Sequence, residues 1–75
     1  MINGITVKPR LSDILAEEGL TQTKLAEMAQ IPQSAISRFD KNASHLDAHL
    51  FAISRALNRP IEDLFNVKQT NEANK

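Results

Sequence analysis

The stretch from Thr21 to Phe39 constrains the fold more than any other part of the chain. Apolar residues recur at helical spacing on both sides of Pro32, which predicts two short amphipathic helices. The buried positions predicted for the two helices are Leu25, Met28 and Ala29 in the first and Ile36 and Phe39 in the second. Proline disfavours helical geometry at the preceding residue but suits the first turn of a new helix. The sequence therefore predicts two helices that meet at a steep angle across a tight turn.

Several residues of this stretch match a known pattern. They are Leu20, Thr21, Gln22, Leu25, Ala26, Ile36, Ser37 and Arg38. In these positions the chain resembles the lambda-repressor-like helix-turn-helix family (Cro/CI or xenobiotic-response-element type), and the resemblance extends from about Leu11 to Phe65. The sequence departs from the family at Gln30, where glycine is usual, and at Pro32, where a capping Ser or Thr is usual.

The remaining apolar residues fit the rest of such a domain. Helix one is predicted from Pro9 or Arg10 to Glu18, helix four from about Asp47 to Leu57 and helix five from Ile61 to Phe65. The predicted fold class is all-α, a compact five-helix lambda-repressor-like domain over residues 9–67.

The two ends of the chain carry weaker signals. Ile5 and Val7 alternate with polar residues, so residues 1–8 are predicted to form an N-terminal arm that is either a short β-strand or a frayed tail. A strand would need a partner, either residues 65–68 or another subunit. Residues 68–75 read KQTNEANK and are predicted to be disordered.

The resemblance implies DNA binding and divides the polar residues into two groups. Base contacts are expected from the outward face of helix three, over about residues 33–39, through Gln33, Ser34 and Ser37. Glutamine pairs bidentately with adenine, and serine contacts either kind of base edge. Contacts to phosphate are expected from Gln22, Thr23, Lys24, Arg38, Lys41 and Asn42. Such contacts fix the register of the protein on the duplex.

Composition limits the other function classes. The chain has 75 residues, no cysteine and two glycines, which excludes a disulfide framework, a cysteine zinc site and a glycine-rich phosphate loop. His45 and His49 have metal-capable spacing but lack a third ligand, so they are expected to be exposed polar surface. We therefore expect no enzyme, no cofactor, no metal and no membrane segment, and a cytoplasmic protein.

The sequence thus predicts a sequence-specific transcriptional regulator, a repressor that binds a near-palindromic operator in double-stranded DNA as a homodimer. The net charge of zero weakens this prediction, because nucleic-acid-binding domains are often strongly basic. Two alternatives follow. One is an antitoxin that uses the same fold to bind its operator and a toxin, and the other is a protein–protein adaptor that no longer binds DNA.

Overall fold

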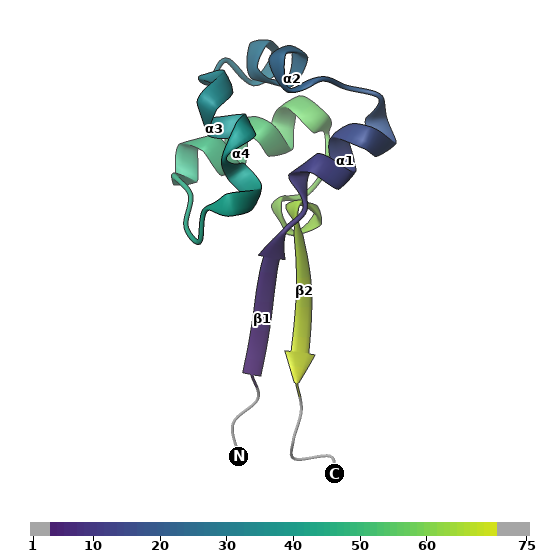
Figure 1. Ribbon diagram of the computed structural model, residues 1–75, viewed down its shortest axis with the longest axis vertical. Helices are drawn as coiled ribbons and strands as arrows, with labels where there is room; N and C mark the ends of the chain where they lie inside the picture. The colour runs from purple at the N-terminus through teal and green to yellow at the C-terminus, as the bar shows by residue number, and fades with distance from the viewer. Residues whose placement is uncertain (1–3, 71–75) are drawn as a thin grey trace.

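The computed structural model describes residues 4–70 and consists of a helical part and a two-stranded arm (Figure 1). The elements in chain order are β1 Gly4–Pro9, α1 Leu11–Glu18, α2 Gln22–Ala29, α3 Gln33–Ser37, the 3-10 helix η1 Phe39–Lys41, α4 Asp47–Leu57, the 3-10 helix η2 Ile61–Leu64 and β2 Phe65–Thr70.

A single apolar cluster joins the helical elements. Its buried members are Leu11, Ile14, Leu15, Leu25, Ala26, Ile36, Phe39, Ile53, Leu57 and Leu64. Phe39 is 1% exposed, which confirms its predicted place in the core. The prediction for Met28 was wrong, because its side chain is 42% exposed. The buried stripe of α2 is centred on Leu25 and Ala26, so Met28 lies at its outer edge.

The helix ends follow from local chemistry. Thr21 caps α2, and its hydroxyl oxygen accepts a hydrogen bond from the Lys24 backbone N–H at 3.0 Å. Gly19, Gln30 and Asn58 end α1, α2 and α4 in the left-handed conformation, with φ of 69°, 59° and 56°. At each end two backbone N–H groups turn back to carbonyls of the last helical turn, which is the Schellman arrangement.

The prediction of an all-α domain with a possible N-terminal β arm was right in part, because the domain is mostly helical but also contains a sheet. β1 pairs with β2 in an antiparallel two-stranded sheet, in a register that places Gly4 opposite Thr70 and Val7 opposite Val67. The strand predicted near the N-terminus therefore finds its partner within the same chain. Disorder from Lys68 onward was also wrong as far as Thr70, because backbone pairing with β1 orders residues whose side chains are polar. Residues 1–3 of the predicted arm and residues 71–75 of the predicted tail lie outside the described residues.

Two predicted helices are shorter than expected. The predicted helix five is the 3-10 helix η2, because only four residues separate Pro60 from the start of β2. The predicted helix three ends at Ser37, and the chain continues through Arg38 into η1. The described domain therefore contains four α-helices, two 3-10 helices and a two-stranded sheet.

The arm extends away from the helices. In Figure 1 β1 and β2 leave the helical part side by side, and the ends of the described chain lie at the tip of the arm. Arg10 fixes the base of the arm, because its backbone N–H donates to the Leu64 carbonyl at 2.9 Å and its guanidinium donates to the Asp63 carbonyl at 2.9 Å.

Candidate nucleic-acid interface

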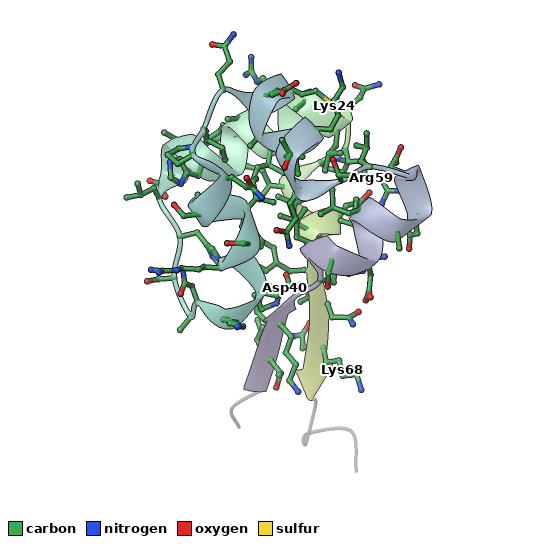
Figure 2. The ribbon with its side chains drawn as sticks, turned by 45° about the horizontal axis from the view of Figure 1, so that its top comes forward. Lys24, Asp40, Arg59 and Lys68 are labelled. Carbon is green, nitrogen blue, oxygen red and sulfur yellow. The ribbon has the colours of Figure 1, made fainter. Side chains whose placement is uncertain are left out.

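The start of α2 presents the first group of predicted DNA contacts. Gln22, Thr23 and Lys24 form the first helical turn after the Thr21 cap, and all three side chains are exposed. Figure 2 shows Lys24 at the end of the molecule opposite Lys68, which lies on the arm. A helix N-terminus attracts anions through its free N–H groups, so this turn is suited to a phosphate of the duplex backbone.

The turn between α2 and α3 retains a helix-turn-helix geometry despite its unusual residues. Gln30 adopts the left-handed conformation that glycine would adopt easily, and the Ile31 backbone N–H donates to the Ala26 carbonyl at 3.1 Å. Pro32 then has the extended geometry of an N-cap, with φ −61° and ψ 143°, and α3 begins at Gln33. The departures from the family pattern are therefore accommodated within the same kind of turn.

The short helix α3 has one anchored face and one open face. Ile36 is 3% exposed and Ala35 is half-buried, so these two residues fix the helix on the core. Gln33, Ser34 and Ser37 are exposed. The Ser37 hydroxyl donates to the Ser34 carbonyl at 3.2 Å, which leaves its oxygen free to accept.

Asp40 ties the end of this region to α1, a role that the sequence did not suggest. One carboxylate oxygen accepts from the Leu11 backbone N–H at 2.7 Å, and the other accepts from the backbone N–H and hydroxyl of Ser12 at 3.0 and 2.7 Å. The Arg10 side chain does not cap α1, so Asp40 supplies the missing acceptors from a distant part of the chain (Figure 2).

The environment of Asp40 favours its charged form. Partial burial raises the pKa of the Asp40 carboxyl, but the hydrogen bonds from Ser12 and Leu11 and the nearby His45 outweigh burial and hold the pKa below its ordinary value. The charge of Asp40 is therefore satisfied at α1, and it offsets less of the positive charge around α3.

His45 is also a structural residue, contrary to its predicted role as exposed surface. Its ring stacks on Phe39 with a centroid distance of 4.0 Å, and its Nε2 lies 2.7 Å from the Phe39 carbonyl oxygen. Phe65 completes the ring cluster at 5.7 Å from Phe39. Because His45 is engaged with both neighbours, it joins η1 to the base of the arm. Over residues 4–70 there is no group of three or more His, Cys, Asp or Glu side chains able to hold a metal ion.

Ion pairs on one side of the helical part engage two acidic residues of α1. Glu17 accepts from Arg10 at 2.7 Å and from Arg59 at 3.0 Å, and Arg59 also contacts Glu18 at 3.0 Å. These pairs join α1 to the turn after α4.

The cations on α2 and just after α3 differ from Arg10 and Arg59, which form ion pairs. Within the described part of the chain Lys24, Arg38 and Lys41 form no ion pair, and all three are exposed. Glu27 adds one exposed carboxylate on α2. The surface around α2 and α3 therefore has an excess of positive charge although the chain as a whole is neutral.

A shallow, open hollow lies beside α3. Ser34, Arg38 and Asn42 line it from one side, and Leu46 and His49 line it from the segment that enters α4. The structure thus brings these three predicted DNA-contacting residues together around one depression. Asn42 has φ −89° and ψ 141°, so its backbone is extended.

Comparison with known proteins identifies the family. A family model of the Cro/C1-type HTH DNA-binding domain matches residues 10–70 of the 75. The chain belongs to the Cro/C1-type helix-turn-helix DNA-binding domains. This confirms the family suggested by the sequence pattern and implies that the Cro/C1-type domain binds DNA. The family is typically non-enzymatic. Neither the comparison with curated proteins nor the comparison with solved structures yields a match.

The family match leaves out the first strand of the arm. It includes every helix of the Cro/C1-type domain and all of β2, but it begins at residue 10, just after β1. The first strand of the arm is thus outside the part that defines the family. Across residues 4–70 no helix has both the length and the apolar character needed to span a membrane.

Proposed function

We propose that this protein is a cytoplasmic transcriptional repressor that binds a specific operator through α3. The observation that carries the proposal is the exposed polar face of α3, which is fixed on the core by Ile36. Lys24 on α2 and Arg38 and Lys41 after α3 are exposed and form no ion pair within residues 4–70. In this arrangement α3 enters the major groove while α2 crosses the phosphate backbone.

Each side chain then has a role. Gln33 opens α3 and reads adenine through its amide, while Ser34 and Ser37 contact neighbouring base edges. The proposed phosphate contacts are Gln22, Thr23, Lys24, Arg38, Lys41 and Asn42. The cations among them neutralise phosphate and contribute affinity without sequence information.

The shortness of α3 argues for two copies. A helix of five residues reaches only a few base pairs, so one copy reads too little sequence for a specific operator. Two copies on a near-palindrome double the contacts, with half-site centres about 34 Å apart. Occupation of an operator that overlaps a promoter blocks transcription directly, so we propose repression.

The proposal is tested by changing one proposed base-contacting residue and one proposed phosphate-contacting residue. Selection from random duplexes first defines the operator. We expect Gln33→Ala to reduce the binding free energy for the operator by about 1–3 kcal/mol and to relax base preference at one base pair. Binding to a scrambled duplex should stay unchanged. Arg38→Ala should weaken binding to both duplexes by the same factor, because phosphates are common to all sequences.

Arg55→Ala is the matched control, because Arg55 is an exposed arginine at the end of α4. It should leave binding unchanged. If Gln33→Ala weakens the two duplexes equally, Gln33 does not read a base. If neither variant changes binding, α3 is not the DNA-reading element. If the natural protein binds no duplex in the selection, the adaptor alternative takes the place of this proposal.

A further inference from the structure

The arm has two chemically different faces. Successive residues of a strand point to opposite sides, and directly paired residues point to the same side. Thr6, Lys8, Asn66 and Lys68 line one shallow depression, which places them together on a polar face. Ile5, Val7 and Val67 therefore share the other face, where Val7 is directly opposite Val67 and Ile5 is opposite the uncharged Gln69. We call these three residues the apolar arm face.

The apolar arm face is open to solvent. Ile5, Val7 and Val67 are 62%, 51% and 46% exposed. At the base of the same face Phe65 packs against the core and contacts the ring of Phe39. The face is thus continuous with the core at one end and uncovered towards the tip (Figure 1).

A ribbon of this kind is an incomplete structural unit. Two paired strands alone are at best marginally stable in water, and a sheet normally buries its apolar face against another element. In the described structure the helices cover this face only at its base. An added partner would therefore stabilise the arm by covering Ile5, Val7 and Val67.

We propose that the partner is a second copy of this chain, whose apolar arm face packs on the first around a two-fold axis. A two-fold interface uses the same patch on both copies, so the patch must complement itself. Ile5, Val7 and Val67 are uncharged, and Lys8 and Lys68 lie on the opposite face. Two such faces therefore meet without opposing like charges. This inference rests on the homodimer of the proposed function and assigns its interface.

The dimensions of the arm predict a weak dimer. Strands of six residues are roughly 20 Å long, and two neighbouring strands are about 10 Å wide. This patch is much smaller than the ~800 Å² that each partner buries in a standard stable interface. We therefore expect monomers and dimers to exchange with concentration, and an operator to favour the dimer.

Charge substitution on neighbouring residues tests the assignment. Val7→Asp places a carboxylate on the apolar arm face, whereas Thr6→Asp places it on the polar face opposite Lys68. In sedimentation without DNA, the natural protein and Thr6→Asp should dimerise as concentration rises, and Val7→Asp should remain monomeric. Thermal melting of both variants shows whether the helices stay folded.

The absence of cysteine from the chain allows a second test. A short thiol-specific crosslinker should join copies of Val7→Cys much faster than copies of Thr6→Cys. Equal crosslinking of the two variants, or a natural protein that stays monomeric at its solubility limit, would overturn the inference. If the dimer fails while Gln33 still governs operator choice, only this interface is wrong and the DNA-binding proposal stands.

Discussion

At the scale of single residues, Asp40 connects the segment that follows α3 to the start of α1. Its carboxylate lies just after the helix that carries Gln33, yet it caps the start of α1. Since Asp40 and Leu11 are 29 positions apart, no local pattern relates them. The sequence therefore predicted the polar side chains that are exposed on α3 but not the carboxylate that connects the segment after α3 to α1.

Asp40 should make stability depend on acid pH. Its pKa in the folded chain lies below the ordinary value of 3.8, so its contribution is complete above that pH and is lost as pH falls through the lower folded value. Asp40→Asn should reduce the free energy of unfolding by about 1 kcal/mol at pH 7. The difference from the natural protein should shrink as the pH falls below 3.8.

Urea unfolding at pH 7 and at a pH well below 3.8 measures this effect. Asp13→Asn is the control, since Asp13 is an exposed carboxylate in the first turn of the same helix. Its effect should be smaller at pH 7. A loss for Asp40→Asn that is the same at both pH values would mean that the charge of Asp40 is not what stabilises α1.

At the scale of secondary structure elements, the helices were more predictable than the sheet, of which only the first strand and a possible partner at residues 65–68 were predicted. Apolar spacing is a local signal, and it placed the helix ends to within a few residues. The strand β2 lacks such a signal, because Lys68 and Gln69 are polar and are ordered by pairing with β1. His45 was misassigned for the same reason, since its ring partners Phe39 and Phe65 come from other elements.

A substitution at the end of α2 should stabilise the domain. Gln30 has φ 59°, a conformation that costs a residue with a Cβ atom roughly 1–2 kcal/mol. Gln30→Gly removes this strain but increases the freedom of the unfolded chain. We expect a net gain of about 0.5–1 kcal/mol in the free energy of unfolding, measured by urea titration.

Asn58→Gly is the matched comparison, because Asn58 has φ 56° at the end of α4. Asparagine tolerates this conformation better than glutamine, so the gain should be smaller. An equal or larger gain at position 58 would show that backbone strain is not what distinguishes the two sites.

At the scale of the whole molecule, charge distribution matters more than net charge. The total of zero conceals ion pairs that use Glu17 and Glu18 on one side and leave Lys24, Arg38 and Lys41 unpaired near α3 within residues 4–70. A neutral protein with this charge distribution should bind mixed DNA weakly, and its affinity should still fall as the salt concentration rises.

The salt dependence can be estimated from these cations. Three cations per copy give about six phosphate contacts in a dimer, and each contact contributes a slope near −0.9. A plot of log affinity for the operator against log salt concentration should therefore fall with a slope of about −5. Arg38→Ala should reduce the slope by about two. A slope near zero in the natural protein would contradict phosphate binding by this surface.

The pairing of β1 with β2 also governs when the protein can mature during synthesis. The two strands come from opposite ends of the described chain, so closing them requires the largest loop in the domain. Contacts within the helical part are more local and form sooner. A nascent chain on the ribosome therefore cannot complete its arm until β2 has emerged. The proposed contact between copies then becomes available only to chains in which β2 has emerged and paired with β1.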